Sequence, residues 1–321
     1  MIFPKPLKPG DTVALIAPAF PVSPEQTRKC AEKLRSFGFR VKLGEALRKN
    51  LNFHNYLAGD ASIRGNDINQ MFRDPEVKAI FCIRGGYGSS QVMKYLDFDL
   101  IRKNPKIFVG YSDITNIHAA LQQICGLVSF HGPMVFSNML EHDDTYTRES
   151  FLAAIHMEAE LEFKNPSGKE FQVLSPGVAT GRIIGGNLAV LARGIGSFFQ
   201  LDTAGKILFL EEVDESIPLL DMMITQMEYA GLLEQVNGLL FGNFTNCNNK
   251  KYDASYSIED FFKDKFKKYQ IPMMCDIQSG HEFPMGTIPL GSYCKMDTYE
   301  KRIRFYPMTK VQWEIKKLPL N

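Results

Sequence analysis

The stretch 106–118, KIFVGYSDITNIH, most constrains the fold, because it passes from a strand pattern to a helix pattern within a few residues. The β-branched apolar run 107–109 predicts a buried strand that ends in a turn at Gly110. From Ile114 onwards, apolar residues recur at helical spacing. Ser112 is therefore expected at or next to a helix N-terminus, where unpaired backbone N–H groups can hold a developing negative charge.

Two interpretations of Ser112 are open at this point. Serine at a helix N-terminus most often caps the helix, and the stretch taken alone favours that interpretation. The alternative is a catalytic serine. The nucleophile elbow of hydrolases, however, has glycine two residues after the serine, and Ile114 occupies that position in this chain. The choice depends on what the rest of the chain places near Ser112.

Length and charge set bounds on the class of protein. With 321 residues the chain is long enough for two domains, each with its own core. A formal net charge of +1 with dispersed Lys and Arg gives no footprint for nucleic acid or an anionic membrane, so neither partner is expected. No segment approaches the roughly 20 apolar residues of a membrane span. The N-terminus carries prolines and charges unlike a signal peptide, which predicts a cytoplasmic protein.

Cysteines and other ligand types give no sign of a metal or a disulfide framework. The cysteines are far apart, none forms a Cys-x-x-Cys pair, and most lie in apolar runs, so reduced core thiols are expected. The chain has six of them: Cys30, Cys82, Cys125, Cys247, Cys275 and Cys294. Nor do His, Cys and Asp cluster at ligand spacing, so neither a metal nor a cofactor is predicted.

The first half of the chain alternates strand and helix patterns. Residues 12–17 predict a strand, and a helix follows that Ser23 caps, with proline next and glutamine three residues on. This helix stops at Gly38, and 39–43 predicts the second strand. A further helix is expected over 60–72. Such β-α-β units favour a parallel sheet, and the predicted class is α/β.

A glycine loop, Arg84-Gly-Gly-Tyr-Gly88, follows the predicted strand 79–83. It is neither a P-loop nor a dinucleotide fingerprint, and a plain tight turn is an alternative. However, the loop and Ser112 leave successive strands at the same carboxyl edge, where open α/β sheets bind ligands. His131 follows the next strand, 128–130, and for this residue a structural role is favoured over a role in the site.

The second half has a different pattern. Residues 165–180 mix Pro, Gly, Ser and charged residues, which predicts a linker between a domain at 1–164 and a domain at 181–321. After the linker, strands and helices follow one another without strict alternation. We therefore expect a smaller α+β or barrel-like C-terminal domain.

Ser112 can be a nucleophile only if a base takes its proton, and a carboxylate usually orients that base. His281 is the candidate base, because it lies in a glycine-flanked loop directly after a predicted buried strand. Glu211 is the first acid after the apolar run 206–210, and Glu212 follows it. The alternatives are a histidine in a surface loop and solvated charges at a strand end.

Several motifs, in this order and spacing, resemble the L,D-carboxypeptidase family of serine peptidases over residues 10–306. They are Arg84–Gly88, Gly110–Thr115, His131–Pro133, Gly185–Leu188, Leu208–Glu211 and Gly280–His281. That family also contains enzymes that inactivate microcin C-type peptidyl-nucleotide antibiotics. The resemblance implies a Rossmann-like N-terminal domain, a C-terminal domain with a barrel-like portion, a site between the two halves, and a homodimer.

The resemblance also implies roles for individual residues. Ser112 matches the family nucleophile, Glu211 the triad carboxylate and His281 the general base. Backbone N–H groups of Gly86 and Asp113 match the oxyanion hole. The choice of Glu211 over Glu212 comes from this match and not from a physical argument.

The implied reaction removes the terminal D-alanine from murein tetrapeptides during cell-wall recycling, without metal or cofactor. Arg84 is predicted to bind the free carboxylate of the peptide, with a structural salt bridge as the alternative. Asn187 is predicted as a second substrate-binding residue, with a helix cap as the alternative. Two other functions stay open: a hydrolase of peptidyl-nucleotides with the same triad, and a muropeptide-binding protein without catalysis.

Overall fold

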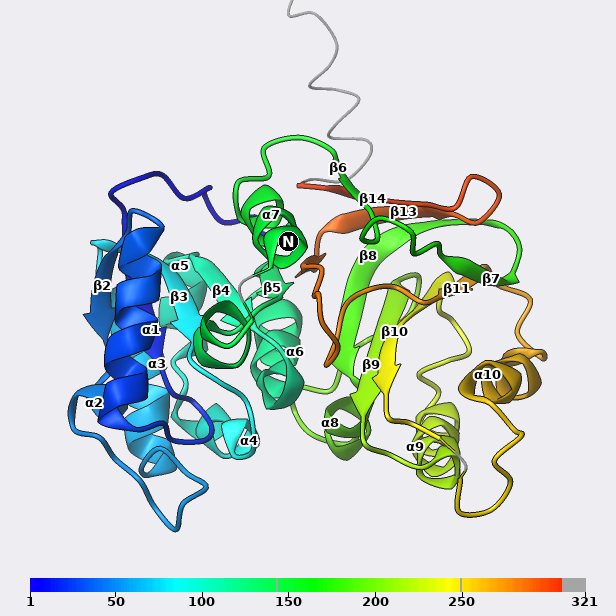
Figure 1. Cartoon of the computed structure of the whole chain (residues 1–321), viewed down its shortest axis with the longest axis horizontal. Coiled ribbons are helices and arrows are strands. Elements are labelled where there is room, and N and C mark those ends of the chain that lie inside the picture. Colours follow the sequence, from blue (N-terminus) through cyan, green and yellow to red (C-terminus); the bar gives the residue numbers. More distant parts are fainter. Residues whose placement is uncertain (143, 249, 308–321) are drawn as a thin grey trace, which may run out of the picture.

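The computed structural model describes residues 1–142, 144–248 and 250–307, and it places two sheets side by side (Figure 1). Within these residues the first sheet has the order β12-β5-β4-β3-β1-β2. The five strands from the N-terminal half run parallel, as predicted, and β12 joins antiparallel. The bounds are β1 (Thr12–Ile16), β2 (Arg40–Leu43), β3 (Val77–Cys82), β4 (Ile107–Gly110), β5 (Ser129–His131) and β12 (Ile288–Leu290).

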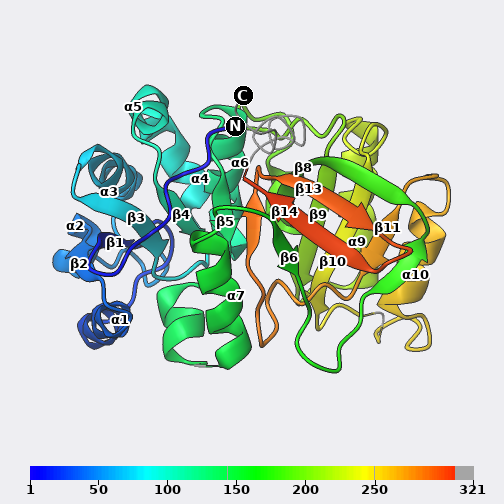
Figure 2. The same cartoon turned by 90° about the horizontal axis from the view of Figure 1, so that it is seen from above.

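Helices cover both faces of this sheet, with α1 and α7 on one face and α3 and α5 on the other (Figure 2). The predicted cap of α1 is confirmed, because Ser23 and Gln26 form a capping box. The helices are α1 (Pro24–Ser36), α2 (Glu45–Arg48), α3 (Ala61–Arg73), α4 (Ser89–Val92), α5 (Phe98–Lys103), α6 (Thr115–Gln123) and α7 (Thr145–Ile155). Short helical turns are η1 (Met93–Tyr95), η2 (Ser112–Ile114) and η3 (Val135–Leu140).

The second sheet has the order β6-β14-β13-β8-β9-β10-β11-β7 in the described chain. Its strands are β6 (Leu161–Phe163), β7 (Gln172–Ser175), β8 (Val178–Asn187), β9 (Ile207–Val213), β10 (Gly238–Thr245), β11 (Met273–Cys275), β13 (Tyr293–Asp297) and β14 (Arg302–Tyr306). The helices α8 (Leu188–Arg193), α9 (Ile217–Tyr229) and α10 (Ile258–Phe266) belong to this half.

This second sheet rolls back on itself along β8. The first half of β8 pairs with β13 and its second half pairs with β9. As a result β13 and β14 cross over the sheet (Figure 1), and their side chains share an apolar cluster with Phe209 of β9 and Leu240 of β10. The rolled sheet is the barrel-like portion that was predicted.

Strand pairing crosses the predicted domain boundaries. Residues 165–180, predicted as a linker, contain β7 and the start of β8. The strand β6 precedes that segment but pairs with β14 of the second sheet, and β12 comes from the second half but pairs with β5. The last residues of the predicted C-terminal domain, 308–321, lie outside the described residues. The two halves are therefore tied together by exchanged strands.

One apolar cluster runs through both halves. It contains residues of α3 and α6 against the first sheet, and residues of α8, α9 and α10 against the second. All six cysteines are free and buried, which confirms the prediction of reduced core thiols. In the described part of the chain, no helix is long and apolar enough to cross a membrane.

Candidate active site

Ser112 lies at the turn between β4 and α6 with a strained backbone. Its φ of +63° falls in the left-handed region, which is uncommon for residues other than glycine and often marks functional sites. No side-chain cap hydrogen bond is formed at the start of η2 or α6. The helix-cap interpretation is therefore wrong, and Ser112 remains partly exposed at the helix N-terminus.

The glycine loop lies directly against Ser112. A Cβ on Gly85 would lie 3.1 Å from the Ser112 Cβ and 3.3 Å from its Oγ. The next residue, Gly86, has a φ of +119°, and a Cβ there would lie 2.3 Å from the ring of Phe20. Within the described residues the Gly86 N–H has no hydrogen-bond partner. Only glycine fits this position, which directly follows the residue that lies against the serine.

Asp113 follows Ser112 and links the turn that carries Ser112 to the glycine loop. Its side chain is buried and accepts a 2.8 Å hydrogen bond from the Ser89 N–H, while its carbonyl accepts one from the Ser89 hydroxyl. Burial raises the pKa of the Asp113 carboxyl, and the hydrogen bonds from Ser89 oppose that shift. The two loops that carry the predicted oxyanion-hole amides are thus joined.

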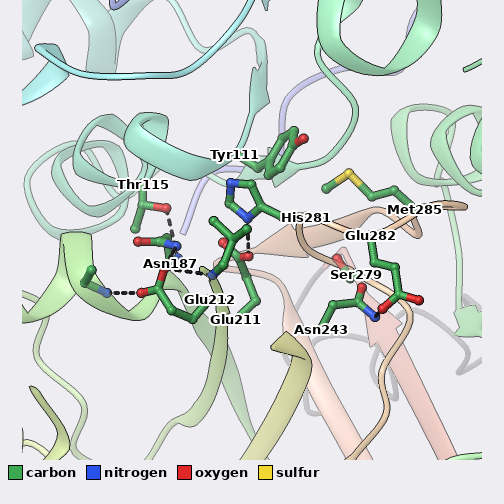
Figure 3. Close-up of polar contacts among 12 residues, drawn as sticks. Tyr111, Thr115, Asn187, Glu211, Glu212, Asn243, Ser279, His281, Glu282 and Met285 are labelled. Atoms are coloured by element: carbon green, nitrogen blue, oxygen red, sulfur yellow. Dashed lines mark hydrogen bonds and ion pairs between the residues drawn. The ribbon is translucent and has the colours of Figure 1, made fainter. Parts of the chain in front are cut away.

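His281 and Glu211 form a buried pair (Figure 3). The His281 Nδ1 lies 2.7 Å from the Glu211 Oε2, with side-chain exposures of 16% and 0%. Burial lowers the pKa of His281, but the charge and hydrogen bond of Glu211 more than offset this, so its pKa lies above the ordinary value. The imidazole packs on the ring of Tyr111 at 4.9 Å between centroids, which places it beside the residue that precedes Ser112. Among described residues, no hydrogen bond joins Ser112 to His281.

Glu212 points away from this pair. Side chains alternate along β9, so Glu211 shares the face of Ile207 and Phe209, whereas Glu212 faces α8. Glu212 accepts hydrogen bonds from the side chain of Asn187 and from the Ala189 N–H at the start of α8 (Figure 3). The geometry therefore separates the two acids, which the sequence left to a family match.

Asn187 is engaged within the protein. Its Nδ2 donates to Glu212 at 2.9 Å, and its Oδ1 accepts from the Val190 N–H, which caps α8. Its own N–H donates to the Thr115 hydroxyl at 3.1 Å, across the junction of the two halves. The helix cap that was the alternative interpretation is present, and both polar atoms of the side chain are bonded within the protein.

Arg84 has an unusual environment at the end of β3. Its guanidinium carbon lies 5.4 Å from the ring centroid of Phe20 and 5.7 Å from that of Phe136. Its Nε is buried without a hydrogen-bond partner, and in the described part of the chain no carboxylate pairs with the group. The structural salt bridge considered from the sequence is absent from those residues, so the cation is available to a ligand.

His131 is fully buried, and its ring lies between Tyr111 at 5.7 Å and Phe209 at 5.2 Å. Neither ring nitrogen has a partner in the described residues, and burial holds its pKa well below the ordinary value. The favoured structural role agrees with this position beneath the site. In the same part of the chain, no group of three His, Cys, Asp or Glu side chains is placed to hold a metal ion.

Sequence reasoning missed three residues that shape the site: Tyr111, Phe20 and Arg64. Tyr111 supports the imidazole, and Phe20 packs against both Gly86 and Arg84. Arg64 is completely buried on α3. A signal for Arg64 existed, because it lies four residues before Ile68 on the apolar side of the helix, where arginine is unexpected.

Comparisons with known proteins agree with the fold and the motifs. Residues 13–132 match the LD-carboxypeptidase N-terminal domain, and residues 180–296 match the LD-carboxypeptidase C-terminal domain. The chain is 40% identical over 299 residues to the probable murein peptide carboxypeptidase of Bacillus subtilis, covering 93% of this chain and 92% of that relative.

Two further relatives have solved structures. The muramoyltetrapeptide carboxypeptidase from Oxalobacter formigenes is 26% identical with a TM-score of 0.81, covering 92% of this chain and all of the other, 100%. The microcin C7 self-immunity protein MccF of Escherichia coli is 27% identical in sequence, with 93% and 94% covered. Its wild-type structure has a TM-score of 0.85 at 25% identity, covering 95% and 98%. The chain thus belongs to the LD-carboxypeptidase family and is a serine-type carboxypeptidase.

Proposed function

We propose that this carboxypeptidase removes the C-terminal D-alanine from murein tetrapeptides with Ser112 as nucleophile, His281 as general base and Glu211 as the orienting acid. The observation that carries the proposal is the 2.7 Å contact between His281 Nδ1 and the buried Glu211 carboxylate, beside the turn that holds Ser112. The names of relatives, which include murein peptide and murein tetrapeptide carboxypeptidases, support the substrate class.

The mechanism follows from which ring nitrogen is engaged. Because Nδ1 donates to Glu211, Nε2 is free to take the proton of Ser112 as the hydroxyl attacks the amide carbonyl before D-alanine. The imidazolium then protonates the leaving amine. Glu211 stabilises the imidazolium, and the amides of Gly86 and Asp113 receive the developing oxyanion. Water releases the acyl group by the reverse proton movements.

An exopeptidase must also recognise the free carboxylate at the end of its substrate, and we assign this to Arg84. A guanidinium pairs with a carboxylate through two parallel hydrogen bonds. The rings of Phe20 and Phe136 flank the Arg84 cation and restrict its orientation, and its buried Nε has no partner among the residues that the structure describes. Arg84 directly precedes Gly85, the residue that lies against Ser112, so the assignment places carboxylate recognition in the same loop as the proposed oxyanion amide.

The deciding experiment is incubation of the protein with L-Ala-D-Glu-diaminopimelate-D-Ala, followed by mass spectrometry. We expect free D-alanine and the tripeptide from the wild type, and intact tetrapeptide from Ser112→Ala. The matched control is a tetrapeptide that ends in D-alanine amide, which lacks the free carboxylate and is expected to be cleaved poorly. Intact tetrapeptide after prolonged incubation with the folded wild type would contradict the proposal.

The likeness to MccF supports a second candidate, hydrolysis of aminoacyl-nucleotides by the same triad. One solved MccF structure contains glutamyl sulfamoyl guanosine and another contains aspartyl sulfamoyl adenosine. Parallel assays with murein tetrapeptide and with aspartyl sulfamoyl adenosine compare the two functions by kcat/KM. We expect the tetrapeptide to be preferred. A muropeptide-binding protein without catalysis would bind the murein tetrapeptide in calorimetry and would not hydrolyse it.

Two further predictions concern the state of the protein. We propose that it acts as a homodimer, as the family resemblance implied, and that it lies in the cytoplasm, as the composition of its first residues predicted. Light scattering coupled to size exclusion gives the mass in solution, and cell fractionation of the native host gives the location. A monomer at micromolar concentration, or recovery outside the cytoplasm, contradicts the respective prediction.

A further inference from the structure

Arg64 of α3 has no exposed surface, yet in the described chain no carboxylate lies within ion-pair distance of it. Its Nε donates to the Gly59 carbonyl at 3.0 Å, and its Nη1 donates to the carbonyls of Pro18 at 2.6 Å and Gly88 at 2.8 Å. Its Nη2 donates to the Gln91 side chain at 2.8 Å. A buried cation is costly unless it is compensated, and here backbone carbonyls provide most of the compensation.

These bonds join the two loops that meet at Gly86. Pro18 belongs to the loop after β1, which places the Phe20 ring in the space where a Gly86 side chain would lie. The Phe20 N–H also donates to the Gly85 carbonyl at 3.3 Å. Gly88 is the last residue of the glycine loop, so Arg64 is bonded both to this loop and to the loop after β1.

The peptide unit between Gly88 and Ser89 is bound from both ends. Its carbonyl accepts from Arg64 at 2.8 Å, and its N–H donates to the Asp113 carboxylate at 2.8 Å. Asn116 adds a 3.0 Å bond to the Ser89 hydroxyl, which itself donates to the Asp113 carbonyl. A cation at the oxygen and an anion at the N–H both strengthen the polarisation of this one peptide, in a region from which water is excluded.

We propose that Arg64 and the Asp113 carboxylate act as a charge clamp across the Gly88–Ser89 peptide, and that this clamp fixes the Gly86 amide relative to the Asp113 amide. The proposal rests on the function proposed above, because those two amides are its oxyanion hole. Oxyanion donors act through preorganisation, and a displacement of about 1 Å can cost on the order of 10²-fold in rate. The side chains of both clamp residues act by positioning, and only the backbone N–H of Asp113 meets the substrate.

Three substitutions test the clamp. Asp113→Asn keeps the shape and an oxygen for the Ser89 N–H but removes the anion. Arg64→Met removes the cation and its hydrogen bonds, and Arg64→Lys keeps the charge without the planar fork. For Asp113→Asn and Arg64→Met we expect kcat to fall about 10- to 100-fold while KM changes by less than about threefold. Arg64→Lys should recover part of the loss.

Two additional readouts separate positioning from general damage. Affinity for a phosphonate analogue of the tetrahedral intermediate should fall by the same factor as kcat, whereas affinity for the tripeptide product should not. If the two charges act as one unit, Arg64→Met combined with Asp113→Asn should lose no more activity than the worse single variant.

Asp67→Asn is the matched control. Asp67 is a buried carboxylate on the same helix as Arg64, but it accepts from the N–H groups of Glu45 and Ala46 at the start of α2. Its substitution should lower the melting temperature and leave kcat and phosphonate affinity unchanged. A positioning defect and a loss of stability are thereby distinguished on one helix.

The clamp is refuted if Asp113→Asn and Arg64→Lys are folded with unchanged kcat and phosphonate affinity, or if the losses of the two sites multiply. Should Arg64→Met not fold, the other two variants carry the test. Failure of the proposed function is recognised separately, by absence of turnover in the wild type. In that case the free energy of unfolding is measured for the wild type, Arg64→Met, Asp113→Asn and the double variant. If the losses of the two single variants add up to the loss of the double variant, the clamp is refuted.

Discussion

The side of the site that carries the proposed nucleophile depends on backbone groups, whereas the side that carries the proposed base depends on side chains. On the N-terminal side, Ser112 has a φ of +63°, and the Phe20 ring fills the space where a Gly86 side chain would lie, while the Gly86 N–H has no partner among the described residues. On the C-terminal side, Glu211 lies on the paired strand β9 and His281 on the loop after β11, and the two side chains meet through one hydrogen bond. The first side is built from backbone turns that hydrogen bonds join, and the second from two side chains that lie 70 residues apart in sequence.

This difference indicates how each side responds to substitution. A backbone site fails when a Cβ or a charge displaces the turn, and many side-chain changes in its surroundings leave the amides in place. A side-chain site fails when a single atom changes, even if the shape is kept. Isosteric substitutions are therefore the sharpest way to compare the two sides, and they are expected to differ in size as follows.

Ser112→Ala should have the largest effect. Removing the hydroxyl while keeping the turn is expected to lower kcat on the order of 10⁴-fold or more, because no other group can form the acyl intermediate. The measurement is D-alanine release, with circular dichroism to confirm an unchanged fold. Residual kcat within about tenfold of wild type would remove Ser112 from the mechanism.

Glu211→Gln and Glu212→Gln form a matched pair on adjacent positions. Glu211→Gln should lower kcat on the order of 10³- to 10⁴-fold, because the imidazole loses its orienting charge. Glu212→Gln should lower kcat less than about tenfold and cost about 1–3 kcal/mol of unfolding free energy, because Glu212 accepts from Asn187 and the start of α8. Steady-state kinetics and urea unfolding measure both. If Glu212→Gln instead shows the large loss of kcat and Glu211→Gln does not, Glu212 is the acid that orients His281.

Arg84→Met should act on binding instead of chemistry. The substitution keeps an apolar stem between the rings of Phe20 and Phe136 but removes the cation, so KM for the tetrapeptide is expected to rise about 10- to 100-fold. The control is the tetrapeptide that ends in D-alanine amide, whose KM should change little. If KM for both substrates stays at the wild-type value, Arg84 does not bind the carboxylate.

The pH profile should show the smallest effect. His281 must be neutral to act as base, and its pKa is raised above 6.5, so kcat/KM should reach half its plateau above pH 6.5. Glu211→Gln should move that midpoint to lower pH, and Glu212→Gln should move it less. The raised pKa also means that the pair stabilises the fold fully below pH 6.5 and less as pH rises through the folded-state value. If the pH midpoint of kcat/KM is the same in Glu211→Gln as in the wild type, the titration seen in the profile is not that of the His281–Glu211 pair.

Local patterns predicted the N-terminal half well. The strand into Gly110, the helix after it and the capping box at Ser23 are determined by residues close in sequence. The identity of the acid was not predictable in this way, since the alternation along β9 places Glu211 and Glu212 on opposite faces but does not say which face meets His281. That decision depends on a loop 70 residues later.

Elements that contain glycine or proline were the hardest to predict. The strand β8 includes Gly185 and Gly186, and its first residues were predicted as linker. A Cβ on Gly186 would lie 2.6 Å from the Thr115 hydroxyl, so the glycine reflects a close approach between the two halves instead of a turn. The strand β12 is three residues long with a central proline, a pattern that does not indicate a strand without its partner.

The exchange of β12 limits how this protein can be dissected. An N-terminal fragment that ends at the predicted linker would keep Ser112 but expose β5 as an unpaired edge strand. The strand that pairs with β5 is β12, which follows the His281 loop in the C-terminal fragment. Exposed edges of this kind invite pairing with other chains. To obtain the two halves separately, one would therefore co-express them or fuse residues 286–291 to the N-terminal fragment. Each half contributes a strand to the sheet of the other, so neither sheet is complete alone.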